Sequence, residues 1–208
     1  MLKDTGERVI PEAMKPANGL LLEHLARYYF ALPYGHGRIL DIACGTGYGA
    51  KMMAKLRRKT VTEVIGVDIN EDAVEYGRHN HFHPLLKFCT GDALDPALKE
   101  RVGMFDTILS FETIEHVPDD RGFLANIYSM LKPGGTLVLS TPFGEGRGKP
   151  CGSPFHYHQL SEREFMDLFS SELKFKVTDF YYQQGVAIER YKRPGGIYPI
   201  GIAVAVKA

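Results

Sequence analysis

The stretch from Arg38 to Ala50 constrains the fold of this chain more than any other. Its first part, Ile39–Ile42, has the composition of a short buried strand, and three glycines follow at alternate positions. Glycine lets the backbone turn sharply and approach a ligand where a Cβ atom would collide. A helical pattern then runs from Tyr48 to about Arg58. This order predicts free backbone N–H groups and a helix N-terminus at the carboxyl end of a strand, where parallel sheets bind ligands.

Asp41, within this strand, indicates which ligand the loop binds. The residues from Gly45 to Ala50 also fit the dinucleotide fingerprint G-x-G-x-x-G/A. A pyrophosphate requires N–H donors and no nearby carboxylate, whereas the α-amino group and the sulfonium of S-adenosylmethionine are cationic. Asp41 therefore favours S-adenosylmethionine. An NAD-dependent dehydrogenase and a non-catalytic protein that keeps a cofactor fold are the alternatives.

Two further carboxylates follow predicted strands at positions that suit the same cofactor. Asp68 ends a predicted strand 23 positions after Gly45, the spacing at which an acidic residue reaches the two hydroxyls of a ribose. Asp92 follows the short strand predicted at Leu85–Cys89. Its alternative role is to cap a short helix around Pro96–Glu100. The glycine loop and the carboxylate at Asp68 form a stronger signal together than either does alone.

These segments resemble motif I and its companions in the class I S-adenosylmethionine-dependent methyltransferases, and Leu131-Lys132-Pro133-Gly134-Gly135 before a buried strand resembles a structural turn of that family. The sequence departs once, because Ala43 stands where the first glycine is usual. The resemblance covers almost the whole chain and implies a single α/β domain over residues 1–208. It implies a Rossmann-like, seven-stranded sheet in the order 3-2-1-4-5-7-6, with strand 7 antiparallel and helices on both faces.

The resemblance also implies a function and a set of cofactor contacts. The function is transfer of the methyl group of S-adenosylmethionine to an O or N nucleophile of a small molecule, which leaves S-adenosylhomocysteine. Asp92 would accept a hydrogen bond from the adenine amino group. The contacts would come from Asp41, Ala43, Gly45, Gly47, Asp68, Ile69, Asp92, Ala93 and Phe111.

The segment Phe111–Pro118, after the fourth predicted strand, carries the candidates for chemistry. His116 and Glu112 are the expected catalytic residues, with His116 as general base. If the segment takes a helical turn, Glu112, Glu115 and His116 point to one side and, with a histidine at 156 or 158, can ligate Mg²⁺, Mn²⁺ or Zn²⁺. Of these two histidines, we take His158 as the candidate metal ligand. This pattern resembles the metal-binding segments of ubiquinone-biosynthesis O-methyltransferases and of small-RNA 3′-terminal 2′-O-methyltransferases. The alternative is that His116 acts without a metal and the glutamates cap helices or bind substrate.

The N-terminal residues 1–16 show neither helical nor strand periodicity. Thr5-Gly6-Glu7-Arg8 resembles the opening of a group of bacterial methyltransferases in which this segment lies over the cofactor pocket. In that case Arg8 would pair with a carboxylate of the cofactor or the substrate. The alternative is a frayed terminus.

Composition excludes several classes of partner. The 25 basic and 25 acidic residues cancel, so the chain has no broad electrostatic surface for nucleic acid or an anionic membrane. Three cysteines without C-x-x-C spacing predict reduced thiols in a cytoplasmic protein, and no apolar run is long enough for a membrane span. His79, His81 and His83 would not share one side of a helix end, so they are expected in solvent rather than on a metal.

The remaining sequence predicts helices, strands and one long loop. The run Asn18–Ala31 predicts a helix in which His24 and Tyr28 pack against the sheet. The loop Thr141–Ser161, about 20 residues rich in glycine and proline, is of the kind that is usually functional. The last elements are a helix at Glu162–Ser171 and strands at Leu173–Tyr182 and Ile200–Val206.

Overall fold

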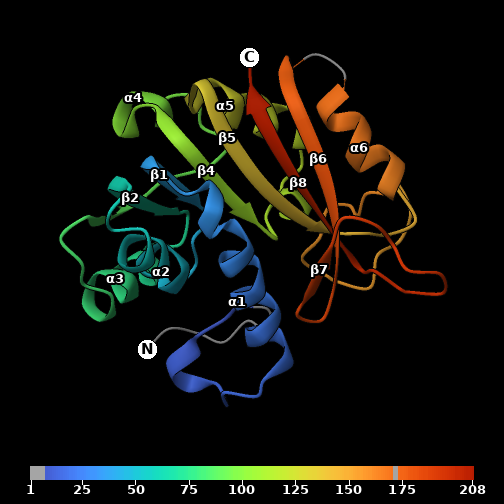
Figure 1. Cartoon of the computed structure of the whole chain (residues 1–208), viewed down its shortest axis with the longest axis horizontal. Coiled ribbons are helices and arrows are strands. Elements are labelled where there is room, and N and C mark those ends of the chain that lie inside the picture. The colour runs from blue at the N-terminus through green and yellow to red at the C-terminus, as the bar shows by residue number, and fades with distance from the viewer. Residues whose placement is uncertain (1–7, 171–172) are drawn as a thin grey trace.

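A single mixed sheet forms the centre of the molecule (Figure 1), which is a computed structural model that describes residues 8–170 and 173–208. Its strands are β1 (Gly37–Ile42), β2 (Val61–Asp68), β3 (Leu86–Thr90), β4 (Phe105–Phe111), β5 (Leu131–Pro142), β6 (Phe175–Gln184), β7 (Ala187–Glu189) and β8 (Ile200–Lys207). Within the described residues they lie in the order β3-β2-β1-β4-β5-β8-β6-β7. Strands β1 to β5 are parallel, and β8 is antiparallel to both β5 and β6.

The predicted fold class is confirmed, with one more strand than the seven expected. If β8 is counted as the seventh predicted strand, the order 3-2-1-4-5-7-6 is present, and β7 is added at the edge. It pairs with β6 from Gln184↔Ala187 onward, so a two-residue turn joins the strands. Gly185, the first turn residue, has φ +56°, which glycine adopts without strain. The dipeptide Gly185-Val186 was the sequence signal for this hairpin.

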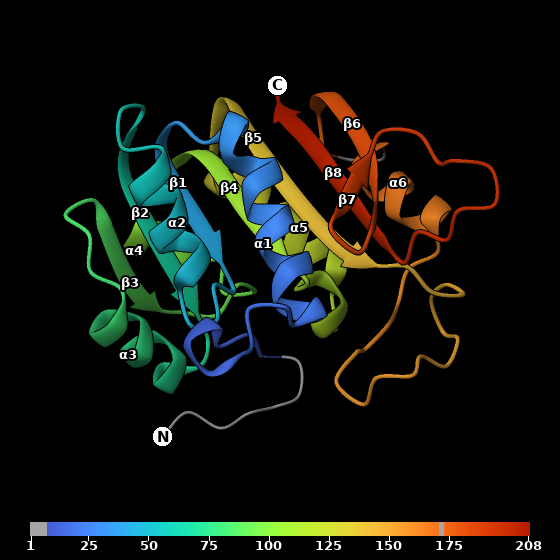
Figure 2. The same ribbon diagram turned by 60° about the horizontal axis from the view of Figure 1, so that its bottom comes forward.

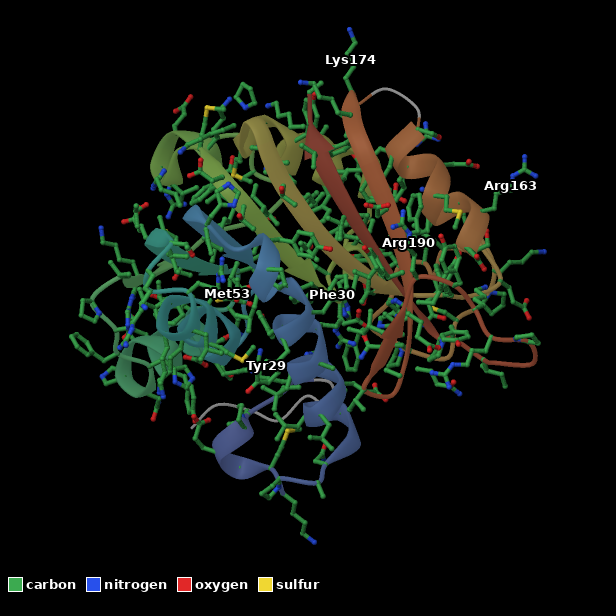
Figure 3. All side chains as sticks on the ribbon, in the orientation of Figure 1. Tyr29, Phe30, Met53, Arg163, Lys174 and Arg190 are labelled. Carbon is green, nitrogen blue, oxygen red and sulfur yellow. The ribbon has the colours of Figure 1, made fainter. Side chains whose placement is uncertain are left out.

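The helices cover both faces of the sheet (Figure 2) and are α1 (Gly19–Ala31), α2 (Tyr48–Leu56), α3 (Glu71–Asn80), α4 (Leu98–Val102), α5 (Asp120–Met130) and α6 (Glu162–Ser170). Buried side chains of α1 and α2, including Tyr28 and Met53, pack with one face of the sheet. Phe123 of α5 and Phe165 of α6 pack with the other face, together with α4. In contrast, Arg163 extends from α6 away from the sheet, with 93% of its side chain exposed (Figure 3).

Local hydrogen bonds and strand pairing set the ends of the helices and strands. The side chain of Asn18 accepts a hydrogen bond from the Leu21 N–H, so α1 begins where the sequence predicts. The predicted turn at Leu131–Gly135 is instead the start of β5, because Leu131 already pairs with Phe105. A register shift follows before the regular pairing resumes. Ser171, the predicted last residue of the helix now seen as α6, lies outside the described residues.

The histidines at the end of α3 differ from the expectation of a solvated helix end. His79 is exposed, but His81 is only 3% exposed and packs edge-on against the ring of Tyr76. The next residue, Phe82, is exposed, and His83 is half-buried. No helix in the described part of the chain has the length and the apolar character needed to cross a membrane.

Candidate functional site

A cavity of about 740 Å³ opens at the carboxyl ends of the parallel strands, beside the glycine loop between β1 and α2. This is the edge at which open α/β sheets bind their ligands. Eight of the ten predicted cofactor residues line it: Arg8, Ala43, Gly45, Asp68, Ile69, Asp92, Ala93 and Phe111. The cavity is therefore built from the segments that the sequence motifs marked.

The glycine loop turns through three residues with positive φ. Gly45 and Gly47 have φ of +56° and +83°, and Ala43 has φ of +56°. A Cβ atom on Gly47 would lie 2.3 Å from the Phe88 ring, whereas one on Gly45 would meet nothing within 4 Å. Gly47 thus packs beneath the loop and does not line the cavity. Ala43 occupies a conformation that costs an L-residue about 1–2 kcal/mol, which explains why a glycine is usual there.

Asp68, at the end of β2, faces the cavity and also holds the glycine loop. Its Oδ2 atom accepts a hydrogen bond from the Gly45 N–H at 2.8 Å, and Oδ1 accepts one from the Asn70 N–H at 2.9 Å. Burial raises the pKa of this carboxyl, although the two N–H groups and the charge of Arg8 oppose the rise. Each oxygen keeps a further lone pair, so the carboxylate can accept hydrogen bonds from a diol in the cavity.

Asp41 lies behind the cavity wall, not in the lining. The residue is 1% exposed, and the Tyr28 hydroxyl lies 3.2 Å from its Oδ1 and 3.0 Å from its Oδ2. Burial is the main cause that raises the pKa of Asp41 to about 7. A carboxyl in this position acts on a ligand through its charge and by holding the loop, not by direct contact.

Asp92 holds a turn after β3. Its Oδ1 atom accepts a hydrogen bond from the Leu94 N–H at 2.8 Å, and the side chain lines the cavity. The alternative role as N-cap is wrong, because α4 begins at Leu98 and its N-cap is Ala97.

The start of the described chain packs against the glycine loop. The Thr46 hydroxyl donates a hydrogen bond to the Val9 carbonyl at 2.9 Å, and Val9 is buried. Further along, Glu12 accepts a hydrogen bond from the Tyr76 hydroxyl of α3 at 3.2 Å. Arg8 lines the cavity, while Thr5, Gly6 and Glu7 of the sequence motif lie outside the described residues.

Two glutamates after β4 are held by neighbouring hydroxyls at the end of β5. Ser140 donates a hydrogen bond to Oε1 of Glu112 at 2.7 Å, and Thr141 donates one to Oε2 of Glu115 at 3.0 Å. Glu112 has φ of +50°, a strained backbone conformation of the kind found at functional sites. Burial, followed by the nearby charge of Glu112, raises the pKa of Glu115 well above its usual range.

His116 ends the short 3-10 turn Ile114–His116 that takes the place of the expected α-helical turn. Its Nδ1 atom lies 3.1 Å from the Phe155 carbonyl oxygen. Its ring packs edge-on against the ring of His156, with the two ring centroids 4.7 Å apart. Ligand atoms of Glu115, His116 and His156 lie within 4.8 Å of one another.

The group that the structure assembles differs from the predicted metal set in two residues. Glu112 lies outside it, and so does His158, whose Nε2 is 3.7 Å from Oδ2 of Asp120. His156 lines the cavity, whereas His158 is buried and faces Asp120 instead. His156 is therefore the histidine that joins the cluster.

Sequence reasoning missed several residues of the cavity. His24 was expected to pack against the sheet, but it lines the cavity, and its Nδ1 is 3.1 Å from the Tyr48 hydroxyl. Burial, and then the charge of Arg27, lowers the pKa of His24 to about 3, so the ring is neutral. The one feature of the sequence that could have placed His24 at the cavity is its position on the helix before the strand that leads into the glycine loop.

Comparison with known proteins identifies the family. Residues 35–195 match the family model described as "Methyltransferase domain". A Mycolicibacterium smegmatis protein named "Probable S-adenosylmethionine-dependent methyltransferase" is 32% identical over 172 residues, which cover 80% of this chain and 63% of that protein. The ubiquinone biosynthesis O-methyltransferase of Xanthomonas euvesicatoria pv. vesicatoria is 32% identical over 131 residues, 61% of this chain and 52% of that protein.

A solved structure shows the same fold. The SAM-dependent methyltransferase from Archaeoglobus fulgidus has a TM-score of 0.65 at 17% identity, over 91% of this chain and 95% of that one. The chain spans 42 to 63% of the length of the curated relatives named here and others like them. The family match, over most of the sequence, decides against the dehydrogenase alternative. The chain therefore belongs to the methyltransferase domain family, whose curated relatives include proteins named as S-adenosylmethionine-dependent methyltransferases.

Proposed function

We propose that this protein transfers the methyl group of S-adenosylmethionine to an oxygen or nitrogen nucleophile of a small molecule. The observation that carries the proposal is the single cavity region that joins the glycine loop and Asp68 to His116 and Glu112. Its volume of about 740 Å³ lies in the range of small-molecule sites, roughly 300–1,000 Å³. A nucleoside-binding edge and a proton-accepting side chain thus share one space.

The residues present fit the proposed cofactor. Asp68 offers lone pairs to ribose hydroxyls, and Asp92 lines the same cavity in a position to accept from an adenine amino group. A ligand can approach the backbone at Gly45, where even a Cβ atom would meet nothing within 4 Å. The carboxyls of Asp41 and Glu112, in their ionised form, favour a cationic ligand. When bound, the sulfonium supplies an electrophilic methyl group.

The chain itself has to orient the acceptor and remove a proton. His116 lines the cavity and is our candidate for the general base. Its neighbour Glu115 is buried and hydrogen-bonded to Thr141, so it keeps the turn in place. Glu112 is fixed by Ser140 at the edge of the same cavity and is a second group that an acceptor hydroxyl or amine can contact.

The balance of charge supports a small acceptor. The chain has 25 basic and 25 acidic residues, so it has no excess of positive charge to favour a nucleic acid as the acceptor. The cavity lining includes the neutral His24 and the aromatic rings of Tyr48 and Tyr157, which suit a partly apolar molecule with hydroxyl or amino groups.

The test has a binding arm and a turnover arm. Calorimetric titration with S-adenosylhomocysteine is expected to show one site, and Asp68→Ala to weaken it by about 2–3 kcal/mol, since bonds to charged groups contribute about 1.5–3 kcal/mol each without full additivity. The exposed Asp72→Ala is the control on the neighbouring helix. Unchanged affinity in a folded Asp68→Ala protein would contradict the assignment of this pocket.

In the turnover arm, radiolabelled S-adenosylmethionine is offered with a panel of small hydroxylated and amino compounds. On an acceptor that is methylated, His116→Gln is expected to lower kcat by about 10²- to 10⁴-fold, the contribution of a general base. Affinity for S-adenosylhomocysteine should stay unchanged. His79→Gln, at an exposed histidine, should leave both unchanged. Methyl transfer at the wild-type rate by His116→Gln contradicts the assignment of the base.

A second candidate is a metal-assisted O-methyltransferase, and the clustering of Glu115, His116 and His156 favours it. Two imidazoles and a carboxylate suit Zn²⁺ or Mn²⁺, and a cation there would lower the pKa of an acceptor hydroxyl. The cation would also have to displace the proton that burial favours on Glu115.

Metal binding can be measured without the acceptor. After removal of metals with a chelator, titration with Zn²⁺ or Mn²⁺ should show one site that His156→Gln weakens and His79→Gln does not. Chelated protein that binds neither ion, and that still transfers methyl groups undiminished, leaves His116 as a metal-free base.

A further inference from the structure

The loop from Phe143 to Ser161 enters the cavity through His156 and Tyr157. It is closed at its base, where the Gly144 N–H donates a hydrogen bond to the Leu160 carbonyl at 2.9 Å. The loop is therefore a defined excursion from the end of β5, and its tip reaches the turn that carries the proposed base.

Two main-chain groups of the loop contact that turn. The Tyr157 N–H donates a hydrogen bond to the Glu115 carbonyl at 2.9 Å. The Phe155 carbonyl lies 3.1 Å from Nδ1 of His116. Together these contacts attach the loop tip to Glu115 and to His116.

The contact with Phe155 sets the tautomer of His116. A carbonyl oxygen only accepts hydrogen bonds, so Nδ1 must carry the hydrogen. In a neutral imidazole the other nitrogen, Nε2, is then the basic one. It lies 3.9 Å from Oε1 of Glu115. The position of one loop carbonyl thus decides which nitrogen of His116 is available to take a proton.

Asp120, the first residue of α5, contacts both limbs of this loop. The residue is 6% exposed. Arg147, on the first limb, donates a hydrogen bond to its Oδ2 atom, and Nε2 of His158, on the second limb, lies 3.7 Å from the same oxygen. His158 follows Phe155 by three residues, so the second contact lies close to the carbonyl that faces His116.

We infer that Asp120 is a positioning residue that holds the loop from both limbs and thereby keeps His116 in its Nδ1–H tautomer. The inference rests on the proposed function, because this tautomer leaves Nε2 to accept the proton from the acceptor. A carboxylate suits the task, since one oxygen attracts a guanidinium and an imidazole N–H at once. An amide in its place carries no charge to attract either group.

The test reads the tautomer directly. Long-range ¹H–¹⁵N spectra of the histidine rings are recorded at a pH about two units above the usual histidine pKa of about 6.5, where the rings are neutral. His116→Gln assigns the resonance. In the wild type, Nδ1 is expected at the shift of a protonated nitrogen and Nε2 at that of an unprotonated one. Asp120→Asn should lose this pattern, toward the Nε2–H form.

The neighbouring Asp119 provides a matched control. It caps the same helix by accepting a hydrogen bond from the Gly122 N–H, and its side chain is exposed. Asp119→Asn removes the same charge but keeps a good N-cap residue. It should retain the wild-type pattern, so a change confined to Asp120→Asn cannot come from the stability of α5.

If Asp120→Asn does not fold, Arg147→Met removes one of the two contacts from a part-exposed side chain, and a weaker Nδ1–H signature is expected. A wild-type ring in the Nε2–H form overturns the inference, and so does a variant at Asp120 or Arg147 that keeps the wild-type pattern. Neither cofactor nor acceptor is present in these spectra. Failure here is therefore distinct from failure of the titration and turnover tests of the proposed function.

Discussion

Tyr28 and Asp41 form a buried pair beneath the glycine loop, with the hydroxyl of the tyrosine between the two carboxylate oxygens at 3.0 and 3.2 Å. The pair joins α1 to β1. It requires Gly49 in α2, because a Cβ atom there would lie 1.8 Å from the Tyr28 ring. A glycine of the motif thus admits a tyrosine from a preceding helix, and that tyrosine is the hydrogen-bond partner of the motif's carboxyl.

Tyr28→Phe removes only the hydroxyl of this pair. The carboxyl of Asp41 then loses a donor in a buried site, which costs about 1–3 kcal/mol. We expect a free energy of unfolding lower by that amount at neutral pH. Chemical denaturation measures it, with Tyr29→Phe, at an exposed neighbour, as the control. Equal stability of the two variants would mean that the hydroxyl does not support the carboxyl.

The raised pKa of Asp41 predicts a pH dependence of stability. Burial raises it from 3.8 to about 7, so the folded state binds this proton more tightly than the unfolded state. The contribution to stability is therefore fully present below pH 3.8 and is lost as the pH rises toward 7. Asp41→Asn, which cannot ionise, should become more stable relative to the wild type over that interval, by at most about 1.4 kcal/mol per pH unit.

Denaturation of both proteins at pH 5 and at pH 8 gives the measurement. The difference between the two proteins removes the contributions of Glu115 and Asp68, whose carboxyl pKa values burial also raises. A difference that is the same at both pH values would show that Asp41 keeps an ordinary pKa.

Ala43→Gly is expected to stabilise the protein. Ala43 has φ of +56°, in the left-handed region that costs an L-residue about 1–2 kcal/mol and glycine almost nothing. The greater freedom of glycine in the unfolded chain offsets about 0.4–1 kcal/mol of this gain. We expect a net increase of up to about 1 kcal/mol in the free energy of unfolding, measured by denaturation. Gly45→Ala, at the same φ with open space around its Cβ position, should be destabilising.

The local patterns predicted much of the fold and of the cavity. Asp68 and Asp92 follow parallel strands, so both lie at the edge of the sheet where these strands end. Their positions after predicted strands were therefore enough to place them at one site. The hairpin that adds β7 was missed although glycine begins its two-residue turn, because β7 itself has only 3 residues. A strand of that length shows too little periodicity to be recognised.

Local sequence patterns could not predict the positions of side chains that depend on tertiary contacts. His156 lies with Glu115 and His116, whereas His158 lies 3.7 Å from Asp120 at the start of α5, a residue distant from it in the sequence. His24 lines the cavity because α1 packs next to α2, where the ring of His24 meets the hydroxyl of Tyr48. No periodicity or motif in the sequence marks either of these contacts.

The last prediction concerns the segment before α1. Val9 and Glu12 attach it to the glycine loop and to α3, and Arg8 lines the cavity. If the cofactor binds under this segment, binding should order it and withdraw it from the open states that proteases cut. We expect trypsin to cleave after Arg8 at least about tenfold more slowly with saturating S-adenosylhomocysteine, since tenfold corresponds to only about 1.4 kcal/mol of added protection.

Cleavage after Lys192, in an exposed loop far along the chain, serves as the internal reference because its rate should not change. Glu12→Gln weakens the contact with Tyr76 and should raise the rate of cleavage after Arg8 in the ligand-free protein. Equal rates after Arg8 with and without the ligand, while calorimetry shows saturation, would mean that the segment is only a tail beside the pocket. Protection of the bond after Arg8 but not of the bond after Lys192 would instead make this segment part of the cofactor site.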